Sequence, residues 1–347
     1  MRTTLTLFAY LLLFACNGPQ TNQAPADETA AENPQLKTIG SLEKLDPWFD
    51  SIVPPTSKIE VLAEGYTWSE GPLWLEETQT LIWSDVPENR IFSWKEGEQA
   101  QLYLHPSGNL AGDREGEEGS NGLLLNANGE LVLCQHGDRR MAKMDAPVSA
   151  PKPTYVTLAD MYDGQRFNSP NDAAYDKDGH LYFTDPPYGL PKQMDDPEKE
   201  ITFQGVYRLA PDGQVTLLTD ELTRPNGIAF SPDFSKCYVA NSDPNRAIWM
   251  VYDVMPDKTF ANGKVFFDAT ELVPNNKGLP DGLKVRSDGT LFATGPGGVF
   301  VFSPDGKHLG TIHTGQATAN CCFNKDESVL FMTADMYVAR IILKGDK

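Results

Sequence analysis

The chain of 347 residues has few basic residues, no cysteine pairs with metal-site spacing and no long apolar runs. Its 29 Lys and Arg residues are outnumbered by 48 Asp and Glu residues, which gives a formal net charge of −19. Such a chain lacks the basic patches that contact phosphates, so we expect no nucleic-acid partner. The acidic balance instead favours a protein that attracts cations.

Cysteine is also scarce, with five residues in the whole chain. None belongs to a CxxC motif or to a Cys/His spacing, which argues against a structural zinc site. The neighbours Cys321 and Cys322 lie in a predicted strand and would face opposite sides of it. We therefore expect Cys134, Cys237, Cys321 and Cys322 to be buried free thiols.

The longest apolar run near the start, Leu5 to Phe14, is too short to span a bilayer and follows Arg2, as in a secretory signal. Leu13-Phe14-Ala15-Cys16 resembles a bacterial lipobox, so residues 1–16 are predicted to be a lipoprotein signal peptide that ends at lipidated Cys16. The alternative is an ordinary signal peptide cut nearby. We expect an exported bacterial lipoprotein, facing the periplasm or the cell surface, that contacts the membrane only through this anchor.

Residues 17–57 are predicted to be a flexible tether and N-terminal extension. Its first part, to about Ser41, is rich in Ala, Thr, Gln, Asn, Pro and Glu, a composition typical of disorder. The apolar residues between Ser41 and Pro55 allow a short helix that packs on the following domain.

The remainder of the chain repeats one pattern six times. A polar residue opens a short apolar run, and a second strand-like run begins ten or eleven residues later. Three of the turns between the runs carry Asn-Gly or Asp-Gly, which are strong hairpin signals. Such pairs taken singly are ordinary turn residues, but turn chemistry does not explain a Glu at the first position. The opening residues are Glu70, Asn121, Asn171, Asn226, Asp281 and Asn320, at intervals of 51, 50, 55, 55 and 39.

A period of about fifty residues with several strands in each unit is typical of β-propellers. We predict an all-β, six-bladed β-propeller over residues 58–343, with a central metal-binding channel lined by the first strand of each blade. The last unit has room for three strands only. Lys58 to Ala63 is predicted to supply its fourth, outer strand and so to close the ring.

The six opening residues would then converge on one axis as a ring of oxygen ligands. Amide oxygens with one or two carboxylates suit a hard divalent cation, Ca²⁺ first, with Mg²⁺, Mn²⁺ or Zn²⁺ as alternatives. Asp281 is the ring acid other than Glu70, so it is the candidate general base. Asn168 competes with Asn171 for its place, although the register to the next strand favours Asn171. The acidic segment from Gly108 to Ser120 is expected to be a solvated loop.

Several motifs in this order resemble the SMP-30/gluconolactonase/LRE family, and most closely its bacterial gluconolactonase-like branch. The resemblance covers roughly Lys58 to Leu343. The motifs are Ser69-Glu70-Gly71-Pro72-Leu73-Trp74, Ser169-Pro170-Asn171-Asp172, Thr184-Asp185-Pro186-Pro187-Tyr188-Gly189, Arg224-Pro225-Asn226-Gly227-Ile228 and Leu279-Pro280-Asp281-Gly282. It implies a six-bladed propeller with one catalytic divalent cation on its axis.

The resemblance also implies roles for particular residues. The family's metal ligands match Glu70, Asn171, Asn226 and Asp281, and Asp281 matches the proposed base. The implied reaction is attack of a metal-activated water on the carbonyl of a sugar lactone. Two other readings stay open: hydrolysis of organophosphates or other esters on the same cation, and a propeller lipoprotein that binds a ligand without catalysis.

Four further residues are candidates for substrate binding. Regucalcin-like members carry an Arg two residues before the channel Asn, where this chain has Ser169; Arg166 lies three residues further back. His136 should end its strand near the channel, in a substrate, proton-transfer or structural role. Tyr188 could close over the substrate or pack. Asn121 occupies a ring position that need not touch the metal.

Overall fold

The computed structural model describes residues 36–112 and 116–344. The predicted signal peptide, the lipidation of Cys16 and the first part of the tether lie outside the described residues. No helix in the described part of the chain is long and apolar enough to cross a membrane.

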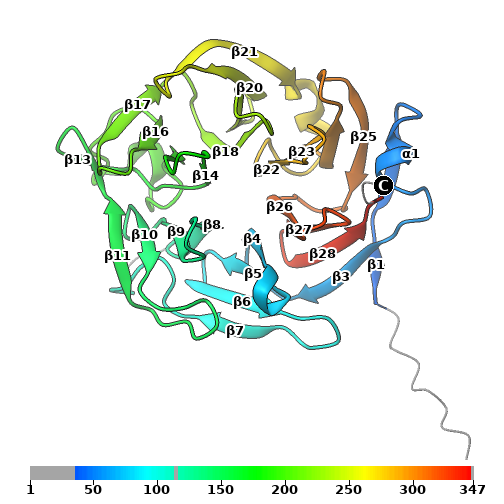
Figure 1. Ribbon diagram of the computed structural model, residues 1–347, viewed down its shortest axis with the longest axis horizontal. Helices are drawn as coiled ribbons and strands as arrows, with labels where there is room; N and C mark the ends of the chain where they lie inside the picture. The colour runs from blue at the N-terminus through cyan, green and yellow to red at the C-terminus, as the bar shows by residue number, and fades with distance from the viewer. Residues whose placement is uncertain (1–35, 113–115, 345–347) are drawn as a thin grey trace, which may run out of the picture. The chain divides into compact units, whose positions relative to one another are not determined.

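Within residues 36–344, six antiparallel sheets of four or five strands are arranged as blades of a ring (Figure 1). Blade 1 contains β4 (Ser69–Leu75), β5 (Thr80–Asp85), β6 (Arg90–Trp94) and β7 (Gln101–Leu104), and blade 2 contains β8 (Ser120–Leu125), β9 (Leu131–Gln135), β10 (Arg140–Met144) and β11 (Tyr155–Ala159). Blade 3 contains β14 (Ala173–Tyr175), β15 (Leu181–Asp185), β16 (Gly205–Leu209) and β17 (Val215–Thr219), and blade 4 contains β18 (Pro225–Phe230), β19 (Lys236–Asp243), β20 (Arg246–Val254) and β21 (Phe260–Asp268). Blade 5 contains β22 (Leu283–Val285), β23 (Leu291–Gly295), β24 (Gly298–Phe302), β25 (His308–His313) and β2 (Ser41–Lys44), and blade 6 contains β26 (Asn320–Phe323), β27 (Val329–Ala334), β28 (Tyr337–Ile342), β3 (Ile59–Glu64) and β1 (Thr38–Ile39).

Short elements complete the described chain. They are the strand pair β12 (Met161–Tyr162) and β13 (Gln165–Arg166), the α-helix α1 (Phe49–Ile52), and the 3₁₀ helices η1 (Glu76–Thr78), η2 (Gln193–Asp195) and η3 (Thr270–Asn275). The all-β propeller predicted from the repeat is therefore confirmed, with each predicted strand pair forming the two inner strands of a blade.

The ring is closed by the N-terminal strand, as predicted. In blade 6, β3 pairs antiparallel with β28, so that Ala63 lies opposite Val338 and Glu60 opposite Arg340. The first and last segments of the propeller thus share one sheet. An antiparallel pair of this kind satisfies backbone groups that an open edge would leave exposed.

The described part of the N-terminal extension differs from a tether. β1 adds to the outer edge of β3, and β2 adds to the outer edge of β25. The predicted short helix is α1, whose Phe49 and Ile52 are buried in an apolar cluster shared by blades 5 and 6. Residues 36–57 therefore extend two blades: β1 and β2 pair with their outer strands, and the apolar side chains of α1 pack in the cluster between them.

The first strands β4, β8, β14, β18, β22 and β26 surround the middle of the ring (Figure 1). Glycine follows the opening polar residue in four repeats, and the structure supplies a reason beyond turn chemistry. A Cβ on Gly227 would lie 2.3 Å from the backbone oxygen of Asp281, and one on Gly71 would lie 2.1 Å from that of Asn121. Neighbouring first strands approach too closely there for a side chain.

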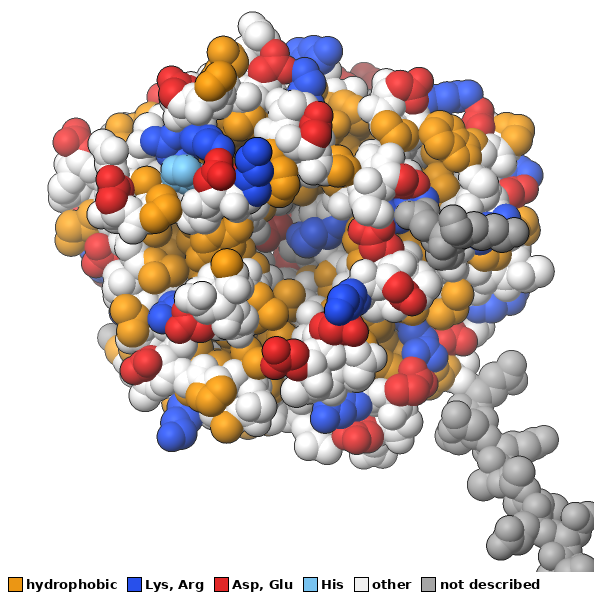
Figure 2. Space-filling view, in the orientation of Figure 1, with side chains coloured by type: hydrophobic (Ala, Val, Ile, Leu, Met, Phe, Trp, Pro, Cys, Tyr) orange, Lys and Arg blue, Asp and Glu red, His pale blue; other side chains and the backbone are white. Residues whose placement is uncertain are grey.

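Aromatic and aliphatic side chains fill the spaces between adjacent blades, in clusters that combine strands of two neighbouring sheets. The four described cysteines are free and buried, as expected. Figure 2 shows one face of the molecule, hollowed near the middle, with acidic and basic side chains interspersed around the hollow.

Candidate active site

A cavity of about 410 Å³ lies where the first strands begin. Five of the six ring residues predicted from the repeat line it. Two supply the acids and three supply the amides. Its lining residues are Trp68, Glu70, Glu117, Asn121, Asn171, Tyr188, Asn226, Ser242, Pro244, Val273, Gly278, Leu279, Asp281, Ala317 and Thr318.

The same local geometry places each of these ring residues. Glu70, Asn121 and Asn226 are each the second residue of the first strand in their blade. Asn171 and Asp281 come two residues before β14 and β22, and their backbone N–H groups donate to Thr184 and Thr294 on the second strands. Each ring residue is therefore held at the same end of its blade.

Three side-chain oxygens at this position are buried and have no hydrogen-bond partner in the part of the chain that the structure describes: Oδ1 of Asn121, Asn226 and Asp281. Asn226 is the clearest case, because its amide nitrogen donates to Ser242 Oγ at 3.1 Å. Ser242 Oγ in turn donates to the backbone oxygen of Pro280. This chain of donors directs the Asn226 amide nitrogen away from the cavity and leaves its oxygen as a free acceptor.

The acids of the cavity repel one another. Burial, together with repulsion from the nearby Asp172 and Glu117 carboxyls, raises the pKa of Glu70 to about 8, against the hydrogen bond from Gly71 N–H. Burial also raises the pKa of Asp281 well above its usual range, with added repulsion from Glu70, Asp172 and Glu117. No Lys, Arg or His is among the described residues that line the cavity.

A cation satisfies both features. Lys284 lies 3.9 Å from Asp172 and its charge also acts on Glu70, but it does not line the cavity. A cation among the lining carboxylates would stabilise them further, and unpartnered amide oxygens are ligands for hard cations. No three His, Cys, Asp or Glu side chains among residues 36–112 and 116–344 are grouped as a metal site. The amide oxygens of Asn171 and Asn226 would therefore have to share the coordination with Glu70 and Asp281.

Aromatic and aliphatic side chains form the rest of the cavity wall: Trp68, Tyr188, Pro244, Val273, Leu279 and Ala317. Tyr188 is tied to blade 4, since its hydroxyl donates to the backbone oxygen of Ser242 at 3.4 Å. The cavity thus combines polar atoms from the ring residues with an apolar wall, the usual composition of a small-molecule site.

Not every predicted residue lines this cavity. Arg166 lies on β13, and its guanidinium donates to the backbone oxygen of Asp138 at 3.0 Å. Asn168 donates through its amide to backbone oxygens of Asp185 and Phe203, so Asn171, and not Asn168, faces the cavity. His136 is fully buried behind the lining residue Glu117.

Among the lining residues that were not predicted, Glu117 and Ser242 carry polar groups that bear on the chemistry of the site. The acidic segment around Glu117 was expected to be solvated, yet this carboxyl lines the cavity and its side chain is 35% exposed. Ser242 lies at the cavity end of β19 and orients Asn226. The composition of the loop gave no signal for Glu117, because acidic residues are equally common on solvated loops.

The sequence matches the family model described as "SMP-30/Gluconolactonase/LRE-like region" over residues 68–335. The chain belongs to this family, as its motifs suggested. It is 40% identical over 332 residues to a gluconolactonase of Zymomonas mobilis, an alignment that covers 91% of this chain and 90% of that protein. It is 24% identical over 270 residues to the pentonolactonase XacC of Haloferax volcanii, covering 76% of this chain and 80% of the relative.

Solved structures agree on the architecture. A gluconolactonase from Xanthomonas campestris superposes with a TM-score of 0.76 at 30% sequence identity, covering 90% of this chain and 99% of that one. Regucalcin from Agrobacterium tumefaciens, described as a calcium-binding protein, superposes with a TM-score of 0.64 at 19% identity, covering 82% of this chain and 94% of its own. At 19% identity, the likeness to this regucalcin shows a shared fold only.

Proposed function

We propose that this protein is a divalent-cation-dependent lactonase that opens gluconolactone-like sugar lactones. The observation that carries the proposal is the cavity in which Glu70, Asn171, Asn226 and Asp281 meet, with unpartnered oxygens and no basic side chain among its described lining. Relatives named gluconolactonase and pentonolactonase support the choice of reaction and substrate. Ca²⁺ is the proposed cation, because the donors are carboxylate and amide oxygens.

In this proposal the side chains of the cavity have separate roles. Glu70, Asn171, Asn226 and Asp281 would hold the cation, which when bound polarises a carbonyl and lowers the pKa of water. Asp281 would accept a proton from the water that attacks the lactone carbonyl carbon. Asn121 Oδ1 is a free acceptor for a sugar hydroxyl, and the apolar wall around Trp68 would pack against the carbon atoms of the ring.

The test is hydrolysis of glucono-1,5-lactone by the wild type, with and without a chelator, beside the variants Asp281→Asn and Glu70→Gln. We expect chelator to abolish activity and added Ca²⁺ to restore it. Asp281→Asn should lower kcat by about 100-fold or more, since general-base catalysis contributes about 10²–10⁴-fold. Glu70→Gln should weaken calcium binding at least about tenfold, because the site loses ligand charge.

Isothermal titration with Ca²⁺ separates the two effects. Activity that survives chelation, or that Asp281→Asn leaves unchanged, would overturn the proposed mechanism while leaving the fold intact. A parallel panel with a phosphotriester and a simple aryl ester asks whether the same cation serves other hydrolyses. Export through residues 1–16 and lipidation of Cys16 remain proposals from the sequence.

A further inference from the structure

The carboxyl group of Glu117 faces the same cavity as Asp281 but comes from a different part of the fold. It lies in the segment between β7 and β8, whereas the proposed metal ligands come from the inner strands of blades 1, 3, 4 and 5. Its charge is felt by Glu70 and by Asp281, both of which it repels. The cavity therefore holds a third carboxyl, which is not among the proposed metal ligands.

Behind Glu117 lies a histidine, His136, on the segment that follows β9. The His136 side chain is fully buried, and neither of its ring nitrogens has a hydrogen-bond partner among the described residues. Its Nδ1 is 3.7 Å from Glu117 Oε2. Burial lowers the pKa of His136 to about 3, so the ring is neutral and carries one N–H. At 3.7 Å the two atoms are just too far apart for a hydrogen bond, so a small shift of the Glu117 side chain would supply the partner that a buried imidazole requires.

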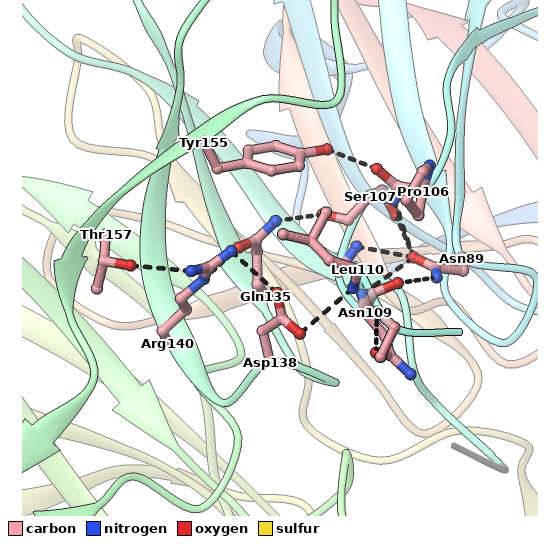
Figure 3. A network of polar contacts seen from close by, with 12 residues as sticks. Asn89, Pro106, Ser107, Asn109, Leu110, Gln135, Asp138, Arg140, Tyr155 and Thr157 are labelled. Carbon is pink, nitrogen blue, oxygen red and sulfur yellow. Dashed lines mark hydrogen bonds and ion pairs between the residues drawn. The ribbon is translucent and has the colours of Figure 1, made fainter. Parts of the chain in front are cut away.

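The backbone on the N-terminal side of this segment is anchored by a polar network (Figure 3). Oδ1 of Asn89 accepts from the N–H groups of Ser107 and Gly108 at 2.9 and 2.8 Å, and its Nδ2 donates to the backbone oxygen of Asn109 at 2.8 Å. Gln135, the neighbour of His136, donates to the backbone oxygen of Ser107 at 2.8 Å. One network therefore ties the segment to the strand that ends beside His136.

The C-terminal side of the segment is fixed as well. Gly119 N–H donates to Val86 at 2.8 Å, and His136 N–H donates to Gly119 at 3.2 Å. Gly189 packs so closely on His136 that a Cβ there would lie 2.8 Å from the His136 Cβ. The backbone and Cβ of His136 are thus held from two sides, and its ring lies next to the Glu117 carboxyl.

We propose that Glu117 is a second catalytic residue, which protonates the leaving ring oxygen, and that His136 is the positioning residue that holds its carboxyl. This inference rests on the proposed lactonase function. Opening a lactone needs a proton at the ring oxygen when its bond to the carbonyl carbon breaks, because an alkoxide is a poor leaving group. Asp281 has a different task, since it takes a proton from water.

The step balances without any further reagent. The water oxygen forms a bond to the carbonyl carbon, and its proton passes to Asp281. The bond from that carbon to the ring oxygen breaks, and the Glu117 proton moves to the oxygen, giving a hydroxy acid. A proton equivalent to that gained by Asp281 returns Glu117 to its starting state through solvent. Although the Glu117 side chain is 35% exposed, the packing around its carboxyl group raises its pKa to about 7, so part of the molecules carry this proton at neutral pH.

The test compares leaving groups. We expect Glu117→Gln to lower kcat/KM on glucono-1,5-lactone by about 100-fold, and on dihydrocoumarin, whose phenolic leaving group needs less protonation, by less than about tenfold. The matched control is Glu118→Gln, a neighbouring acid that accepts a hydrogen bond from Asn109 and does not line the cavity. It should leave both rates unchanged. Equal losses on the two substrates would overturn the role of Glu117.

A double-mutant cycle on glucono-1,5-lactone tests His136. His136→Asn should lower kcat with KM unchanged and should cost nothing more in the presence of Glu117→Gln, because both changes remove one function. Additive losses would overturn the positioning role. Calcium titration of Glu117→Gln should match the wild type; weakened binding would instead make Glu117 a ligand. Wild type without lactonase activity would refute the proposed function itself, whereas active wild type with an unimpaired Glu117→Gln would refute this inference alone.

Discussion

At the scale of single residues, the six ring positions differ in how their polar atoms are satisfied. Asn320 uses its Oδ1 to accept from Cys321 N–H at 2.9 Å, and its Nδ2 lies 3.5 Å from Asp172 Oδ2. It does not line the cavity. Asn121 and Asn226, in contrast, each keep a buried Oδ1 without a partner. The same residue type at the same repeat position is thus structural in one blade and free for a ligand in others.

The buried acids lead to a prediction about pH and calcium. In the metal-free protein the raised pKa values of Glu70 and Asp281 mean that the folded state holds protons that the unfolded chain has released. Stability should therefore fall as pH rises from about 4.5 to about 8. Bound calcium replaces those protons, so it should raise the melting temperature more at pH 8 than at pH 5.5.

Calorimetry on metal-depleted protein, with and without excess Ca²⁺, measures this difference. Glu70→Gln serves as the control, because it removes one of the titrating acids and should reduce the pH dependence. The same calcium-induced shift at both pH values would contradict the prediction.

At the scale of elements, each blade divides tasks between its two inner strands. The first strand of blade 4 presents Asn226, and the second strand presents Ser242, which accepts from the Asn226 amide at 3.1 Å. The hydrogen bond from the Asn226 amide nitrogen to Ser242 fixes the orientation of the amide group, so that its oxygen is left as a free acceptor. Partners of this kind strongly affect metal affinity, although they do not touch the ion.

We therefore predict that Ser242→Ala weakens calcium binding by about 10- to 100-fold with little loss of thermal stability. The matched control is Ser235→Ala on the far end of the same strand pair, where the hydroxyl bonds Asp233. Isothermal titration measures both. An unchanged affinity in Ser242→Ala would show that Asn226 needs no orienting partner, or does not bind the ion.

At the scale of the whole propeller, closure joins residues distant in the sequence. Ile59 of β3 is 2% exposed and belongs to a cluster that includes Leu330, Ala339 and Ile341 of blade 6. Strand β3, which lies near the start of the chain, is therefore part of the core of the last blade. We expect the ring to unfold as one unit, because opening this sheet exposes apolar surface between the ends of the chain.

Ile59→Ala should lower the free energy of unfolding by about 2–5 kcal/mol, the usual cost of truncating a buried Ile. Val156→Ala on the outer strand β11, where the side chain is 45% exposed, should cost far less. Urea unfolding followed by fluorescence and by circular dichroism gives both values and tests for a single transition. Two separated transitions in the wild type would mean that closure does not couple the blades.

The sequence by itself determined the number of blades, the strand that closes the ring and the end of each blade where Glu70, Asn171, Asn226 and Asp281 would lie. The number of blades and the positions of these residues depend on local pairing between adjacent strands, which repeats in register and leaves a pattern in the chain. The closing strand followed because the last unit has room for three strands only. Only the tertiary structure decided that Glu117 faces the cavity, that His136 lies buried behind it and that residues 36–57 extend two blades. Those positions depend on where irregular segments pack between distant strands, and composition carries no record of that packing.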